Sequence, residues 1–202
     1  TTPQTLDAWL QLLEARHPRV IDLGLERCRD VWQRMGSPRP APQLFLVAGT
    51  NGKGSTVATI CGILDGLGYR YGSYTSPHLY RYNERVRVQG EEVSDARLLD
   101  AFERVEAARG ATSLSYFEFG TLAAFSILAR STLDYAVLEI GLCERLDDLE
   151  TREHPEVAVE ASTRADGVDV RADHHRRERW IRAGPGGDDV ADGVDHDIES
   201  EV

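Results

Sequence analysis

The chain has 202 residues, of which 28% are charged, and a formal net charge of −11. This length suggests one domain, or one domain and a tail, with enough residues for a buried core. The negative charge argues against a nucleic-acid partner, because phosphate backbones are bound by clustered basic residues. Three widely spaced cysteines indicate neither a disulfide framework nor a zinc site, so we expect a reducing, cytoplasmic location. No leader and no apolar run of membrane-spanning length is seen, so we expect no membrane association.

Charge and apolar content divide the chain near residue 150. Residues 1–150 carry a net charge of −4 and residues 151–202 a net charge of −7. The second segment has no leucine, phenylalanine or tyrosine. With so few large apolar groups, burial cannot offset the entropy lost on ordering. We therefore expect a folded domain over 1–150 and a mostly disordered tail over 151–202. Within the tail, Val157-Ala158-Val159 is a candidate strand.

The chain begins with a pattern of two helices. Thr5 is positioned to cap the first, whose apolar residues recur at helical spacing. A second helix is predicted from Leu25 to Met35, with Gly36 as its stop signal. Three alternating prolines then form a stiff lead into the first strand. The residues behind these predictions are Leu6, Trp9, Leu10, Leu13, Pro38, Pro40 and Pro42.

The central feature of the sequence is a short apolar run, residues 44–48, that ends in Gly49-Thr50-Asn51-Gly52-Lys53-Gly54-Ser55. The following residues, 56–67, read as a helix that Gly68 ends. A strand, a glycine-rich turn and a helix N-terminus in this order form a phosphate-binding loop, because backbone N–H groups and the helix dipole face the anion.

Lys53 is the only lysine among 23 basic residues. A slim ammonium group fits over phosphate oxygens better than a planar guanidinium does. The spacing departs from the strict P-loop pattern, since Val47 occupies the position of its first glycine. A turn that merely joins a strand to a helix is the alternative interpretation.

Two further strands are expected to reach the same edge of a sheet. Residues 71–75 form a strand that we place next to the first and parallel to it, delivering Ser76-Pro77-His78-Leu79 to the phosphate-binding edge. Val86 and Val88 precede a Gln89-Gly90 turn in a small extended excursion. Helices are predicted from Ser94 to Gly110 and from 116 to 128.

The third main strand, residues 134–139, is apolar until Glu139. An acidic residue at the end of such a strand is the usual holder of a nucleotide's magnesium ion, directly or through water. The alternative is a solvated glutamate at a strand end. The predicted fold is α/β, with a mostly parallel P-loop NTPase-like sheet flanked by helices.

Several stretches together resemble one family, the bifunctional folylpolyglutamate synthase/dihydrofolate synthases of the Mur ligase superfamily. The resemblance extends over about residues 5–148. Its stretches are Ile21-Asp22-Leu23-Gly24-Leu25-Glu26-Arg27, the loop 49–55, Thr75-Ser76-Pro77-His78-Leu79, Asn83-Glu84-Arg85-Val86-Arg87-Val88, Tyr116-Phe117-Glu118-Phe119-Gly120-Thr121 and Leu138-Glu139-Ile140-Gly141-Leu142.

The resemblance implies an ATP-dependent amide ligase with ATP and Mg²⁺ as cofactors. The carboxylate of dihydropteroate or of a reduced folate would attack the γ-phosphate of ATP, and the amine of L-glutamate would then attack the resulting acyl phosphate and release phosphate. A carboxylate is a poor electrophile until its oxygen becomes a leaving group, so the protein's task is positioning and charge neutralisation. A monomer is expected.

The resemblance also implies roles for individual residues. Thr50, Asn51, Gly52, Lys53, Gly54 and Ser55 would hold the triphosphate, with Lys53 as the catalytic cation. Ser76 and Glu139 would be magnesium ligands, with Ser55 as a further candidate. Ile21, Asp22 and Leu23 would line the substrate pocket together with Ser115, Tyr116, Phe117 and Glu118. His78 either orients its loop or is a surface histidine, and Tyr116 and Phe117 either stack on a flat ring or belong to the core.

The chain departs from the family pattern after the third strand. Cys143-Glu144 replaces a glycine pair, Ala165-Asp166-Gly167 lies where a histidine is expected, and the second domain is missing. We hypothesise a truncated or frameshifted copy, which sequencing of the locus would test. A nucleotide- or pterin-binding remnant without catalysis is the alternative function. A small P-loop kinase or switch is disfavoured by the glycine spacing.

Overall fold

The computed structural model describes residues 3–16, 25–49, 51–139, 156–164, 167–174 and 177–183. Its five α-helices are α1 (Leu6–Arg16), α2 (Leu25–Arg34), α3 (Lys53–Gly66), α4 (Asp95–Arg109) and α5 (Tyr116–Ala129). Its strands are β1 (Gln43–Ala48), β2 (Tyr71–Tyr74), β3 (Val86–Val88), β4 (Glu91–Glu92), β5 (Tyr135–Glu139), β6 (Glu156–Arg164), β7 (Gly167–His174) and β8 (Arg177–Ala183). A short 3₁₀ helix, η1 (Tyr82–Arg85), precedes β3.

The strands form one eight-stranded sheet in the order β4-β3-β2-β5-β1-β6-β7-β8. The four central strands, β2, β5, β1 and β6, are parallel, and the pairs at each end are antiparallel. The predicted mostly parallel α/β sheet is confirmed. The expected placement of β2 next to β1 is wrong, because β5 lies between them and pairs with both.

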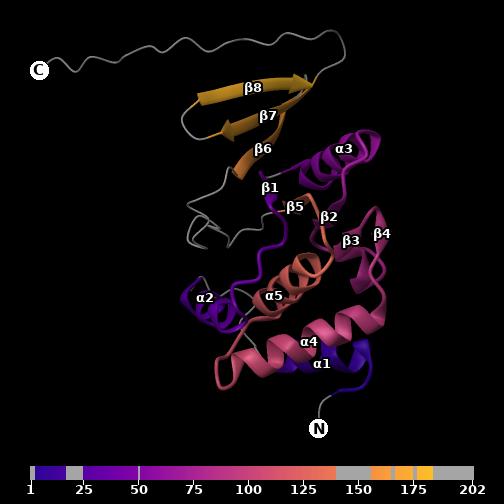
Figure 1. The fold of residues 1–202 in the computed structure, drawn as a ribbon, viewed down its shortest axis with the longest axis vertical. Coiled ribbons are helices and arrows are strands. Elements are labelled where there is room, and N and C mark those ends of the chain that lie inside the picture. Colours follow the sequence, from indigo (N-terminus) through magenta and orange to yellow (C-terminus); the bar gives the residue numbers. More distant parts are fainter. Residues whose placement is uncertain are drawn as a thin grey trace, which may run out of the picture.

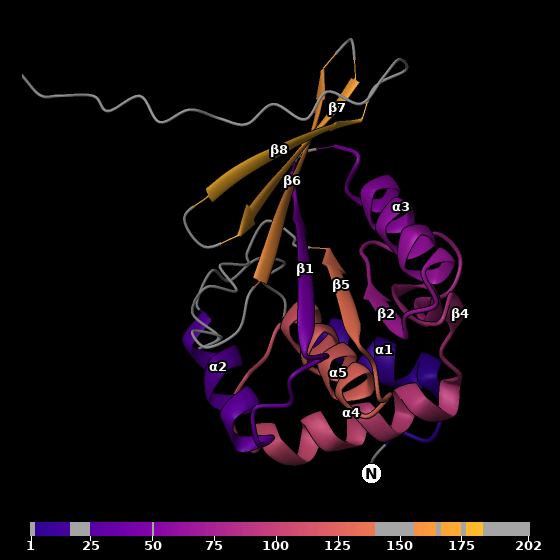
Figure 2. The same ribbon diagram turned by 45° about the horizontal axis from the view of Figure 1, so that its top comes forward.

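Helices cover both faces of the central strands (Figures 1 and 2). Successive side chains of a strand point to opposite faces, so the apolar runs of β1 and β5 supply two separate cores. Leu44, Leu46 and Leu138 pack into the larger core, which α1, α4 and α5 complete. Val47 and Val137 lie on the other face, against Val57 and Leu64 of α3.

The helix boundaries follow their predicted signals. The hydroxyl of Thr5 accepts a hydrogen bond from Ala8 N–H at 3.3 Å, and that of Ser94 accepts one from Arg97 N–H at 3.4 Å. Gly36 and Gly68 follow the ends of α2 and α3 with positive φ. None of the helices in the described ranges has the length and apolarity needed to cross a membrane.

Three strands occur within the segment expected to be disordered. The predicted strand at 157–159 lies inside β6, which pairs with β1 in parallel. β7 and β8 extend the sheet as antiparallel strands. Composition alone does not reveal local periodicity: residues 168–173 alternate valine or alanine with charged residues, a pattern that is typical of a strand. The rest of 151–202 lies outside the described residues.

An ion-pair cluster joins the first helix to the fourth. Arg109 donates to both carboxylate oxygens of Glu106 at 2.6 and 2.7 Å, and Arg16 of α1 donates to it at 2.8 Å. The Arg109 hydrogen bonds, more than those of Arg16, lower the pKa of Glu106 to about 2. A carboxyl with a lowered pKa stabilises the fold above its unfolded pKa, and this contribution is lost as pH falls toward the folded value.

We therefore expect Glu106→Gln to lower the free energy of unfolding by about 1–2 kcal/mol at pH 7, allowing for partial solvent exposure. Urea unfolding at pH 7 and pH 3 measures the difference in free energy of unfolding between the wild type and the variant. This difference should be smaller at pH 3. Glu103→Gln, at an exposed position of the same helix, should change the value by less than about 0.5 kcal/mol. An equal loss at both pH values would show that the pair does not stabilise the fold through its charge.

Candidate functional site

The loops that follow β1, β2 and β5 meet at one edge of the sheet. All three strands are parallel, so their carboxyl ends lie on the same side. Because β5 is the middle strand, Glu139 at its end is level with Val47 of β1 and next to Leu138, the partner of Tyr74 in β2. Glu139 is therefore flanked by the glycine-rich loop and by the loop that begins at Thr75.

The glycine-rich turn has the backbone of a phosphate-binding loop. Gly52 caps the N-terminus of α3 with φ of 81°, and Gly49 has φ of 129°. Residues that carry a side chain rarely adopt a positive φ, which explains why glycine occupies both positions. Lys53 is the first residue of α3, and its ammonium group donates to the Gly49 carbonyl at 3.0 Å. The side chain therefore bends back over its own turn, where the phosphates of a nucleotide would lie.

Glu139 is a buried carboxylate whose side chain is 6% exposed. One of its oxygens lies 3.9 Å from the Lys53 ammonium nitrogen, and the other accepts a hydrogen bond from Ser76 N–H at 3.3 Å. Burial raises the pKa of this carboxyl, and the Ser76 N–H and the Lys53 charge act in the opposite direction. Lys53, Glu139 and Ser76, predicted from three separate stretches, therefore come together.

The loop between β2 and η1 is held by a second carboxylate. Glu84 accepts hydrogen bonds from the backbone N–H groups of Leu79, Tyr80 and Arg81 at 2.8, 2.8 and 2.6 Å. These bonds fix the loop, although Leu79 and Tyr80 themselves remain 82% and 90% exposed. Glu84 thus positions the segment that carries Ser76 to the edge.

His78 orients Arg85, a residue for which the sequence predicted no individual role. Its Nδ1 accepts a hydrogen bond from Arg85 Nε at 2.8 Å. Burial and the nearby Arg85 charge lower the pKa of His78, which favours the neutral imidazole that can accept this bond. Of the two alternatives for His78, this contact supports the orienting role. Arg85 gave no sequence signal beyond its place in the stretch 83–88, because arginine is so common in this chain.

The start of α5 is a capping box. The Ser115 hydroxyl accepts from Glu118 N–H at 3.1 Å, and the Glu118 carboxylate accepts from Ser115 N–H at 2.6 Å. Arg27 of α2 also donates to Glu118 at 3.2 Å. These contacts give Ser115 and Glu118 a structural role. Tyr116 and Phe117 are half-buried, so parts of both rings remain open.

The remaining predicted residues divide into two groups. Asn51, Gly54 and Ser55 are exposed, with Asn51 in the turn and the other two in the first turn of α3. Thr50, Ile21, Asp22 and Leu23 lie outside the described residues. The proposed substrate pocket is therefore represented only by its α5 side.

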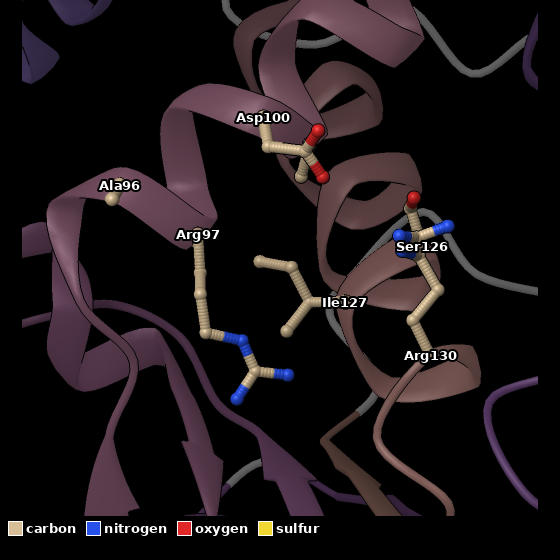
Figure 3. Close-up of a pocket in the computed structure, with 7 residues that line it drawn as sticks. Ala96, Arg97, Asp100, Ser126, Ile127 and Arg130 are labelled. Carbon is tan, nitrogen blue, oxygen red and sulfur yellow. The ribbon is translucent and has the colours of Figure 1, made fainter.

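A cavity of about 320 Å³ lies away from this edge, between α4 and α5 (Figure 3). Arg97 and Arg130 lie on its two sides, and Asp100, which also lines it, is paired with Arg104. It contains none of the residues predicted for the site. The other lining residues are Ala96, Ala101, Ser126 and Ile127.

The residues at the edge fit a magnesium ion bound together with phosphates. Within the described ranges, no cluster of three or more histidine, cysteine or acidic side chains could hold a metal alone. Magnesium differs from zinc in this respect, because it commonly takes one or two carboxylates and completes its shell with water and phosphate oxygens. Buried Glu139, beside Ser76, would be able to supply the protein's share of such a shell.

Comparison with known proteins agrees with this arrangement, although no family model matches the chain. The dihydrofolate synthase/folylpolyglutamate synthase of Escherichia coli is 51% identical over 149 residues, which are 72% of this chain and 35% of that protein. The Mycobacterium tuberculosis protein of the same name is 32% identical over 185 residues, 83% of this chain and 38% of the relative.

The solved structures that resemble this chain belong to the same group of enzymes. Escherichia coli FolC in complex with DHPP and ADP superposes with a TM-score of 0.68 at 49% identity, over 70% of this chain and 34% of that one. The Yersinia pestis enzyme complexed with AMPPNP and Mn ion superposes with a TM-score of 0.67 at 51% identity. The match covers 70% of this chain and 35% of the Yersinia pestis chain. The chain thus spans about a third of the length of the curated relatives it matches.

The sheet, the glycine turn with Lys53 and the acidic end of β5 define a P-loop type nucleotide-binding fold. Within that class, the chain is homologous to the N-terminal part of the dihydrofolate synthase/folylpolyglutamate synthases.

Proposed function

We propose that this chain forms the nucleotide- and metal-binding part of an ATP-dependent amide ligase that adds L-glutamate to dihydropteroate or a reduced folate. The observation that carries the proposal is the convergence of Lys53 and Glu139, 3.9 Å apart, at the edge where the glycine turn ends. Relatives of the same fold have been solved in complex with ADP, or with AMPPNP and a manganese ion.

In this proposal each residue has a stated role. The turn from Thr50 to Ser55 holds the phosphate chain, and the Lys53 ammonium group neutralises its outer oxygens. Glu139 and Ser76 would hold Mg²⁺, with Ser55 as a further ligand, and the ion would supply positive charge to the phosphates. The substrate carboxylate attacks the terminal phosphate of ATP, which forms an acyl phosphate and releases ADP; the amine of L-glutamate then displaces phosphate from the acyl group.

The dihydropteroate or folate substrate would lie next to the Thr75–His78 loop, on the side away from the nucleotide. Tyr116 and Phe117 at the start of α5 offer ring faces to a flat pterin. Ile21, Asp22 and Leu23 complete that pocket in this proposal. Ser115 and Glu118 contribute by capping α5, so that its first turn keeps its position.

Phosphate release separates a ligase from a binding module. The protein would be incubated with ATP, Mg²⁺, dihydropteroate and L-glutamate, and each component omitted in turn. We expect the 202 residues alone to bind nucleotide without glutamate-dependent turnover, because they span about a third of the length of the relatives. Steady release that requires both dihydropteroate and glutamate would contradict this expectation and would assign full ligase activity to this chain.

The alternative function, a nucleotide- or pterin-binding remnant, makes a different prediction for complementation. In the ligase proposal, adding the remaining segment of a relative, from the residue that aligns beyond Glu139, should give glutamate-dependent turnover. A remnant would give none. Melting curves for the chimaera, with and without AMPPNP and Mg²⁺, ensure that a folded, nucleotide-binding protein is being compared.

A further inference from the structure

Arg85 is a buried cation with no carboxylate at ion-pair distance among the described residues, although its charge also acts on the buried carboxyl of Glu139. The residue is only 8% exposed, although arginine is almost never buried without a paired charge. Its Nε donates to His78, and no carboxylate among the described residues forms an ion pair with its guanidinium group. A buried, permanently charged group with spare donors is a site for an anion.

Arg85 lies between the two halves of the proposed site. Its carbonyl accepts a hydrogen bond from Thr75 N–H at 2.9 Å, which ties it to the loop that carries Ser76. Its guanidinium carbon is 5.2 Å from the ring centre of Tyr82 and 5.7 Å from that of Tyr116, the first residue of α5. The Arg85 side chain therefore lies between the sheet edge that carries Ser76 and the aromatic residues at the start of α5.

The surrounding contacts hold the guanidinium group in one orientation. His78 fixes the Nε side, and the two tyrosine rings pack near the planar group. The His78 and Tyr82 ring centres are 5.7 Å apart, so the imidazole is itself packed in place. A guanidinium fixed in this way can pair with both oxygens of a carboxylate at little further entropic cost.

We propose that Arg85 binds the carboxylate of an aromatic carboxylic acid whose ring system lies beside the start of α5, and that it thereby selects acids over neutral analogues. This inference rests on the proposed function, since the carboxylate held here is the one that would be presented to the terminal phosphate. Lys53 and the glycine turn bind the phosphates, so the two cations have separate anions.

Binding of dihydropteroate and of its carboxamide, which differs only in lacking the negative charge, tests this inference. Dissociation constants would be measured by fluorescence titration of the full 202-residue chain in the presence of AMPPNP and Mg²⁺. For the wild type we expect the acid to bind about 10- to 100-fold more tightly than the amide, as for a charge-assisted hydrogen-bonded pair. In Arg85→Gln this preference should fall to less than about threefold.

Arg87→Gln is the matched control. Arg87 lies two residues away on β3 and its exposed side chain pairs with Glu92 at 2.9 Å, so the change in charge is the same while the position differs. This variant should keep the full preference for the acid. A second variant, Arg85→Lys, serves if Arg85→Gln does not fold. Lysine keeps the positive charge but lacks the planar, forked guanidinium group, so the preference for the acid over the amide should fall about fivefold or more.

Three outcomes would overturn the inference. The first is a wild-type protein that does not distinguish acid from amide. The second is an unchanged preference in a folded Arg85→Gln or Arg85→Lys protein. The third is a lower affinity of Arg85→Gln for AMPPNP but not for ADP, with the acid preference intact, since this would assign Arg85 to the terminal phosphate. Nucleotide binding that depends on Lys53 is measured separately, so the proposed function can hold when this inference fails.

Discussion

Lys53→Ala should weaken binding of ATP with Mg²⁺ by about 100-fold, which corresponds to ~2.7 kcal/mol. The ammonium group is held by the Gly49 carbonyl at 3.0 Å and faces Glu139, so it already lies over the turn that would receive the phosphates. Its removal takes away a full positive charge where phosphate charge is concentrated. Equilibrium dialysis with labelled ATP measures the change.

Two further variants define the cause of this loss. Arg97→Ala removes a cation from an exposed position of α4, remote from the sheet edge, and should leave ATP affinity within about twofold. Lys53→Arg keeps the charge but enlarges the head group, and we expect most of the affinity to be lost because a planar guanidinium does not fit over the turn. Equal ATP affinity for Lys53→Ala and the wild type would mean that the phosphates lie elsewhere.

Glu139→Gln should remove the metal dependence of nucleotide binding. The carboxylate is buried, and we expect it to supply the negative charge that holds Mg²⁺ at the edge. In the wild type, Mg²⁺ should tighten AMPPNP binding by about 10- to 100-fold, and in the variant by less than about threefold. Without metal the variant should bind at least as tightly as the wild type, because the carboxylate repels the phosphates.

The stability of this variant gives an independent check. Burial raises the pKa of Glu139, so its ionised form costs folding free energy at neutral pH, and the neutral amide should keep or raise the melting temperature. Asp134→Asn, which removes the same charge just before β5 and breaks the pair with Arg70, serves as the control and should leave metal dependence unchanged. A full magnesium effect in Glu139→Gln would exclude Glu139 as the metal ligand.

Much of the fold could be predicted from local signals. The glycine turn, the caps at Thr5 and Ser94, and the acidic end of the third strand all act within a few residues of where they appear. The order of the strands could not be predicted in this way. Nothing local to β2 says that β5 will insert between it and β1, because that arrangement depends on long-range pairing across the sheet.

The proximity of two predicted site residues could also be expected from the sequence. Lys53 and Glu139 carry recognisable chemistry at strand ends, and the structure brings them within 3.9 Å. Arg85 escaped notice because its burial arises from tertiary packing against Tyr82 and Tyr116 and not from any periodic pattern. The capping roles of Ser115 and Glu118 were also missed, because the family resemblance assigned both residues to the substrate pocket. Serine followed three residues later by glutamate is nevertheless a capping signal.

Titration calorimetry of the wild-type chain with AMPPNP, in Mn²⁺ and again in EDTA, tests the nucleotide site most directly. One molecule of AMPPNP per chain should bind with micromolar affinity in Mn²⁺ and at least about tenfold more weakly in EDTA. A folded protein that takes up no nucleotide under either condition would contradict the assignment of the β1 turn and the end of β5 to phosphate and metal.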